Sequence, residues 1–296
     1  MKILLTGATG FIGTNVATKL ISNGDTIFCT LLENEINPFD SLNVKAFSLG
    51  NYQIVDLIQF IKDNQIEGVI HLASYVQSGD HTTQDIDKLI DSNIKFGTIL
   101  LDAAVNGGVK WFINTGTFWQ NYNNSEYSPV NLYAATKQAF ESIAKLYIDT
   151  EKIRFCTIKL FDTYGPNDSR PKIFNLWEKI AKTGEILDMS PGDQILDISY
   201  IDDIVNAFVL LANHFHNNNP KISNGRVYVV KARNRYNLKE LACIFEEVTG
   251  YKLYINWGGR PYKVREVMNP LVNGEVVPGW KQKITLEEGI KLTLNF

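Results

Sequence analysis

Two periodicities of hydrophobic and polar positions alternate along the first half of this chain. Short apolar runs predict strands, and apolar residues at intervals of three and four predict helices. The predicted strands cover residues 3–6, 26–32, 68–72, 111–114 and 155–161, and the predicted helices follow them at residues 11–21, 54–63, 85–106 and 131–150. Strands that alternate with helices favour a parallel sheet with right-handed crossovers, covered on both faces.

The pattern loosens after Tyr164. Helices are predicted at residues 173–183 and 200–212, and a strand at residues 227–230. Asn237 with Glu240, and Thr285 with Glu288, have the spacing of capping boxes, so each pair predicts the start of a helix. We therefore expect an α/β fold with a larger unit in residues 1–165 and a smaller C-terminal α/β unit in residues 166–296, with some exchange of chain between them.

Composition narrows the class of protein. The chain has 296 residues, of which 45% are hydrophobic, so it can bury a substantial core. Its formal net charge is −3 and it has no long basic run, which disfavours nucleic acid as a partner. No apolar run is long enough to span a membrane, and the first strand leaves no room for a signal peptide, so we expect a cytoplasmic protein. The three cysteines lack metal-ligand spacing, and we expect no metal site.

The first segment with a recognisable chemistry is the glycine-rich turn after the first strand. Gly7 permits a tight turn, Gly10 lets the backbone approach a phosphate, and Gly13 allows close packing of helix and strand. The free N–H groups at the helix N-terminus attract the anion. Such a triplet also occurs in turns without a ligand, but its place here favours dinucleotide binding by a Rossmann-type, doubly wound parallel sheet. The expected contacts are Gly7, Thr9, Gly10, Phe11, Ile12 and Gly13.

A tyrosine and a lysine lie one helical turn apart in the predicted helix of residues 131–150. Tyr133 and Lys137 share a helix face, and a nearby ammonium group is expected to lower the pKa of the phenol. Such a tyrosine can exchange a proton with a sugar hydroxyl or carbonyl group. An exposed Tyr–Lys pair also arises by chance. The glycine turn upstream favours the catalytic interpretation.

The glycine spacing and the Tyr–Lys pair together resemble the extended, sugar-nucleotide-modifying branch of the short-chain dehydrogenase/reductase superfamily. The resemblance implies that Tyr133 and Lys137 are catalytic, that Lys137 also holds the nicotinamide ribose, and that a nearby Ser or Thr contacts the reacting oxygen. Thr117 best fits the last role and Thr115 competes for it, although a threonine at a strand end also commonly caps a turn. The smaller C-terminal unit would be a substrate-binding lid.

Weaker matches to the same family extend over nearly the whole chain. They imply cofactor contacts from Glu33, Asn51, Leu72, Ala73, Ser74, Asn93 and Thr115, and substrate contacts from Thr117, Phe118, Asp162, Arg260 and Arg265. The chain departs from the family pattern at Leu196, where an arginine near the substrate phosphates is usual, and at Asp162, where asparagine is common. Arg260 and Arg265 are then the candidates for holding a diphosphate.

Within the family, the chain looks most like reductases that make CDP-linked dideoxyhexoses, the CDP-abequose and CDP-paratose synthases. Three segments carry this likeness: Ile70–Ala73, Phe112–Trp119 and Tyr133–Phe140. The resemblance implies reduction of a nucleotide-activated 4-keto-6-deoxy sugar in O-antigen-type deoxysugar biosynthesis. Phe118 and Trp119 stand where a 4,6-dehydratase needs an Asp–Glu pair, which argues against dehydration.

A 4-epimerase with the same residues, and a non-catalytic NAD(P)-binding sensor, remain as alternatives. The sequence leaves the cofactor open between NAD(H) and NADP(H). One residue, Glu33 near the end of the second strand, favours NAD. The family also implies a homodimer through residues 93–106 and 134–149.

Overall fold

The computed structural model of the chain describes residues 1–39, 44–50 and 53–294. In these ranges the main sheet has eight strands, all parallel, in the order β14-β11-β6-β5-β4-β1-β2-β3. The strands are β1 (Lys2–Thr6), β2 (Thr26–Leu31), β3 (Lys45–Ser48), β4 (Gly68–His71), β5 (Trp111–Thr117), β6 (Arg154–Leu160), β11 (Val227–Val230) and β14 (Glu275–Val276). The predicted Rossmann-type α/β fold is confirmed. The edge strand β3 was not predicted, because its residues are mostly exposed and lack a buried apolar run.

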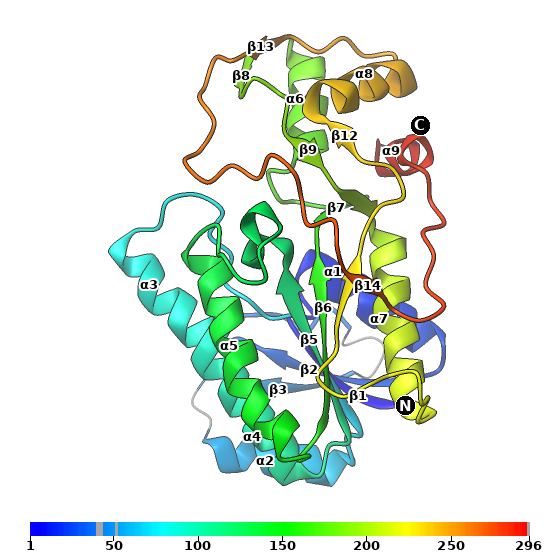
Figure 1. Ribbon diagram of the computed structural model, residues 1–296. Coiled ribbons are helices and arrows are strands. Elements are labelled where there is room, and N and C mark those ends of the chain that lie inside the picture. Colours follow the sequence, from blue (N-terminus) through cyan, green and yellow to red (C-terminus); the bar gives the residue numbers. More distant parts are fainter. Residues whose placement is uncertain (40–43, 51–52, 295–296) are drawn as a thin grey trace.

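Helices cover both faces of this sheet (Figure 1). One face packs against α1 (Phe11–Ser22) and α7 (Ile201–His216), and the other against α2 (Ile54–Asn64), α4 (Gly97–Gly107) and α5 (Leu132–Asp149). The alternation of strand side chains explains the two cores. In β1, for example, Ile3 and Leu5 join the core beneath α1 and α7, whereas Leu4 joins the opposite core.

The helix predicted for residues 85–106 is present as one continuous helix with a π-helical segment in its middle. It begins as α3 (Thr83–Ile90), widens into a π-helical segment at Asp91–Phe96, and continues as α4. Asn93 lies in that segment and is buried. Its amide accepts hydrogen bonds from Ser74 Oγ and the Tyr75 N–H, and donates to the Tyr75 carbonyl and to Thr136 Oγ1. Asn93 therefore joins the segment after β4 to α5.

The smaller C-terminal elements gather at the end of the sheet toward which the strands point (Figure 1). They are α6 (Ile173–Thr183), α8 (Leu238–Thr249), α9 (Leu286–Leu294) and three strand pairs, β7 (Asp162–Tyr164) with β10 (Ile198–Tyr200), β8 (Leu187–Met189) with β13 (Ile255–Trp257), and β9 (Ile195–Leu196) with β12 (Tyr236–Asn237). The capping box predicted at Asn237 and Glu240 is confirmed.

The chain also returns from this region to the main sheet. Helix α7 packs on α1, β11 pairs with β6, and β14 pairs with β11, although all three follow residue 165. None of the helices in the described ranges is both long and apolar enough to cross a membrane.

Candidate active site

The turn between β1 and α1 has space for glycine alone at two positions. Gly7 has φ +69°, and a Cβ atom there would lie 2.7 Å from the backbone nitrogen of Ala73. A Cβ atom at Gly13 would lie 1.9 Å from the carbonyl oxygen of Gly7. Gly10 is the N-cap of α1, and no side chain caps that terminus. The first N–H groups of α1 are therefore available to an anion, as the sequence predicts for a phosphate.

Two adjoining hollows meet at this turn. One, with about 1600 Å³ of open space, extends past Thr9 toward the π-helical segment. The other, with about 1070 Å³, extends past Tyr133 and Lys137 toward the C-terminal elements. Gly7, Gly10, Leu72 and Ser74 line both hollows. An elongated cleft with a phosphate cradle at its middle fits a dinucleotide cofactor.

Tyr133 enters the second hollow from the first turn of α5. Asn131 fixes that turn, since its side chain accepts a hydrogen bond from the Ala134 N–H at 3.0 Å. Burial raises the pKa of the Tyr133 phenol to about 12, and a hydrogen bond with Ser74 acts in the opposite direction. The expectation that Lys137 lowers this pKa is wrong for this structure, because burial outweighs every other influence and Lys137 is not among them. The phenol therefore holds its proton at neutral pH.

Lys137 lies one turn further along α5 and is 2% exposed. Burial lowers the pKa of its ammonium group to about 8, and the charge of Glu141 opposes that shift. The residue lines the cleft, and its ammonium group has no hydrogen-bond acceptor within residues 1–39, 44–50 and 53–294. It can accept a hydroxyl group of a ligand as its partner.

Both candidate threonines of β5 face the same hollow. Thr117 Oγ1 accepts a hydrogen bond from the Trp119 N–H at 3.3 Å, so the residue caps the short helix that follows. Its hydroxyl proton remains available to a ligand. The hydroxyl oxygen of Thr115 is buried without a partner in the described part of the chain. The cleft therefore contains two hydroxyl groups, and Thr117 lies at the strand end.

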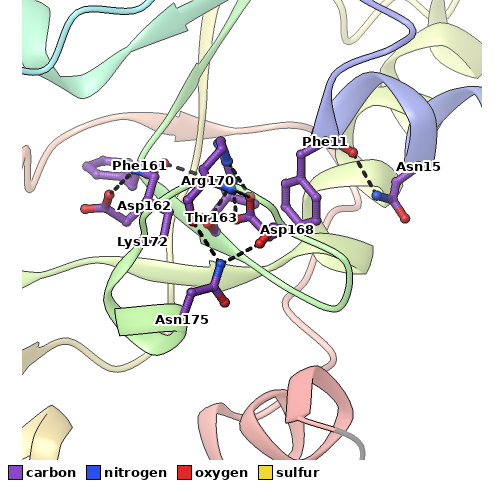
Figure 2. Close-up of polar contacts among 9 residues, drawn as sticks. All are labelled: Phe11, Asn15, Phe161, Asp162, Thr163, Asp168, Arg170, Lys172 and Asn175. Carbon is purple, nitrogen blue, oxygen red and sulfur yellow. Dashed lines mark hydrogen bonds and ion pairs between the residues drawn. The ribbon is translucent and has the colours of Figure 1, made fainter. Parts of the chain in front are cut away.

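Sequence reasoning missed the loop of residues 168–172, here called the cationic loop, which brings Arg170 and Lys172 to the lining of this hollow (Figure 2). Arg170 forms a bidentate ion pair with Asp168, at 2.7 Å for both contacts, and lies 4.7 Å over the ring of Phe11. Lys172 Nζ lies 3.3 Å from a carboxylate oxygen of Asp162. Arg170, Lys172 and Asp162 all line the hollow that contains Tyr133. The sequence signal that could have revealed this loop is the pair of basic residues Arg170 and Lys172 between a predicted strand and a predicted helix.

A third hollow, with about 540 Å³ of open space, shares Phe118, Trp119 and Asp162 with the second. Arg265 lines it, donates to Ser128 Oγ at 2.6 Å, and lies 4.2 Å over the ring of Tyr122. Its Nε atom is buried without a partner in the described ranges. Arg265 therefore brings a guanidinium group to the wall of this hollow, and such a group suits an anionic ligand.

The remaining predicted site residues divide into two groups. Phe11, Ile12 and Gly13 line the second hollow, and Thr9 and Ala73 line the first. Arg260 is exposed and lines none of the three hollows described above. Glu33 is also exposed, whereas Glu35, which sequence reasoning did not select, lines the first hollow. The expectation for Asn51 lies outside the described residues.

Glu35 is tied to the glycine turn. Its carboxylate accepts hydrogen bonds from Thr9 Oγ1 at 2.7 Å and from the Leu32 N–H at 2.8 Å.

In the described ranges no three His, Cys, Asp or Glu side chains come together to hold a metal ion.

Comparisons with known proteins show which family and which structures the chain is similar to. The model of the NAD dependent epimerase/dehydratase family matches residues 3–230. A CDP-abequose synthase of Salmonella muenchen is 28% identical over 298 residues, which cover 99% of this chain and 97% of that protein.

Solved structures share the fold. The UDP-glucose 4-epimerase of Thermotoga maritima with UDP-glucose superposes with a TM-score of 0.83 at 22% identity, over 100% of this chain and 98% of that one. The UDP-glucose 4-epimerase of Thermus thermophilus in complex with NAD gives 0.78 at 19% identity, with the same coverage.

Proposed function

The chain belongs to the NAD-dependent epimerase/dehydratase family, and from this premise we propose that it is an NAD(P)-dependent reductase of a nucleotide-activated 4-keto-6-deoxy sugar. The observation that carries the proposal is the convergence of Tyr133, Lys137 and Thr117 on a cleft that is continuous with the glycine turn. The similarity to CDP-abequose synthase over nearly the full length of both chains supports a reductase of this kind.

Each of the three residues has a task in such a reduction. Thr117 donates its free hydroxyl proton as a hydrogen bond to the keto oxygen and polarises the carbonyl group. When bound, the nicotinamide supplies the hydride to C4. Tyr133, which is protonated at neutral pH because burial raises its pKa to about 12, gives its proton to the resulting alkoxide. Lys137 lies one turn further along the same face of α5, and its ammonium group is proposed to hold the nicotinamide ribose.

The substrate's diphosphate is proposed to lie between the second and third hollows. Leu196 lines the third hollow and brings no charge, so other cations must balance the phosphates. Arg265 lines the third hollow, and Lys172 lines the adjoining hollow from the cationic loop. We assign phosphate binding to these two residues, with Arg265 as the main contact.

For the cofactor, the position of Glu35 favours NAD(H) over NADP(H). Its carboxylate lies beside Thr9 in the first hollow, where the adenosine half of the cofactor would bind. A carboxylate there can accept a hydrogen bond from the ribose 2′-hydroxyl group and repels a 2′-phosphate.

The proposal is tested by adding NADH or NADPH and 4-keto-6-deoxy sugars linked to CDP, GDP or dTDP, and following the loss of reduced nicotinamide. The wild-type protein is expected to consume reduced nicotinamide with one of these substrates. The rate is expected to fall at least about 100-fold in Tyr133→Phe, because the variant lacks the proton donor. A 4-epimerase would instead interconvert nucleotide sugars without net consumption of cofactor. Absence of both activities in protein that binds the cofactor would leave the sensor alternative.

A further inference from the structure

A buried polar cluster lies beneath the candidate active site, between the ends of β5 and β6 and the inner face of α5. Gln120 is fully buried at its centre. Its side-chain oxygen accepts a hydrogen bond from the Thr117 N–H at 2.9 Å, and its side-chain nitrogen donates to Gln138 at 2.8 Å and to Glu141 Oε1 at 3.1 Å. The cluster therefore connects the backbone of the candidate catalytic threonine to α5.

Glu141 is the acidic member of this cluster. It follows Lys137 by four residues, so the two side chains share a face of α5. Its carboxylate lies close against β5, since a Cβ atom at Gly116 would be 3.0 Å from Glu141 Oε1 and 2.9 Å from Lys159 Cγ. Glycine at position 116 thus leaves the space that this carboxylate occupies.

Two lysines border the cluster, and both are buried. Lys137 is 2% exposed, and Lys159, whose ammonium group donates to Asn121 Oδ1 at 2.9 Å, is 7% exposed. Burial lowers the pKa of both lysines, and in both the charge of Glu141 is the influence that raises it. Burial raises the pKa of the Glu141 carboxyl group, and the charge of Lys159, the hydrogen bond from Gln120 and the charge of Lys137 act in the opposite direction.

We propose that Glu141 is a positioning residue, whose carboxylate, held by Gln120, balances the buried lysines and keeps Lys137 charged in the active site. A buried ammonium group without a counter-charge loses its proton readily. The other groups that face Lys137 cannot replace Glu141. His71 of β4 is neutral at pH 7, because burial and Lys137 lower its pKa, and Tyr133 keeps its proton.

The role rests on the proposed function, in which Lys137 acts as a charged group, but it can be measured without turnover. The ¹³Cε resonance of Lys137, assigned by its loss in Lys137→Arg, is titrated by NMR in the protein alone. In Glu141→Gln the contact with Gln120 can persist while the charge is removed. The pKa of Lys137 is then expected to fall by about one unit or more. In Glu141→Asp, which keeps the charge, it is expected to remain near the wild-type value.

Asp149→Asn is the matched control, because it removes an exposed acid from the same helix. This variant is expected to leave the titration of Lys137 unchanged. The proposal is overturned if Lys137 titrates in Glu141→Gln as it does in the wild type, or if Glu141→Asp lowers its pKa as much as Glu141→Gln does. If Glu141→Gln fails to fold, the titration of Lys137 in Glu141→Asp decides. A large fall in the pKa of Lys137 in that variant refutes the role of the Glu141 charge.

Discussion

Replacing Lys137 with methionine is expected to stabilise the protein at neutral pH while removing its proposed activity. The side chain is 2% exposed, and burial is the largest cause of the drop in its pKa from 10.5 to about 8. That drop corresponds to about 3 kcal/mol at pH 7, because one pKa unit is worth about 1.4 kcal/mol. Methionine has a similar length and retains the packing of the lysine stem.

The dependence on pH separates this charge effect from a packing effect. The native state has the lowered pKa, so the cost of the buried charge is present in full below about pH 8 and disappears as the pH rises toward 10.5. Urea unfolding should therefore show Lys137→Met more stable than the wild type by about 3 kcal/mol at pH 7 and nearly equal to it at pH 10.5. Tyrosines that titrate in this range are present in both proteins and cancel in the difference.

Lys145→Met provides the control on the same helix, because Lys145 is exposed and its loss should produce no pH-dependent gain. A Lys137→Met protein that is less stable than the wild type at pH 7 would refute the reasoning. So would a stability difference that stays constant between pH 7 and pH 10.5.

Three further predictions concern the cleft. Gly7→Ala should weaken cofactor binding and destabilise the protein by more than Gly24→Ala, as measured by calorimetry and urea unfolding, because both glycines have positive φ but only at Gly7 would the new Cβ atom meet backbone. Glu35→Gln should raise kcat/KM for NADPH relative to NADH by about tenfold, and an unchanged ratio would exclude Glu35 as the selector. Arg265→Met should raise the substrate KM by about tenfold with little change in kcat, whereas Arg260→Met, at an exposed position, should change neither.

Local signals in the sequence predicted much of the fold. The succession of strands and helices follows from hydrophobic periodicity, and the start of α8 follows from the side chains of Asn237 and Glu240, which act within one turn. The π-helical segment was not predicted, and Asn93 within it forms hydrogen bonds with partners 18 to 43 residues away along the chain. Periodicity does not report such tertiary contacts.

The candidate site was predicted where a motif determines geometry and missed where packing does. The turn at Gly7 and the helix face shared by Tyr133 and Lys137 follow from spacing alone. The burial that raises the pKa of Tyr133 depends on the surroundings of α5, so reasoning from the neighbouring lysine gave the wrong direction. Glu35 and Arg170 reach the cleft through loops, whose paths no local pattern predicts.

The return of the chain from the C-terminal elements to the main sheet constrains how the protein is made. While the ribosome has synthesised only residues 1–165, β6 is an open edge, because its neighbour β11 begins at Val227. The apolar surface that α7 later covers, including the ring of Trp111 that stacks on Phe215, is also exposed to water at that stage. An unpaired edge beside an uncovered apolar face invites aggregation. Residues 201–230, which form α7 and β11, therefore protect both the edge of β6 and the apolar face beside it once they are in place.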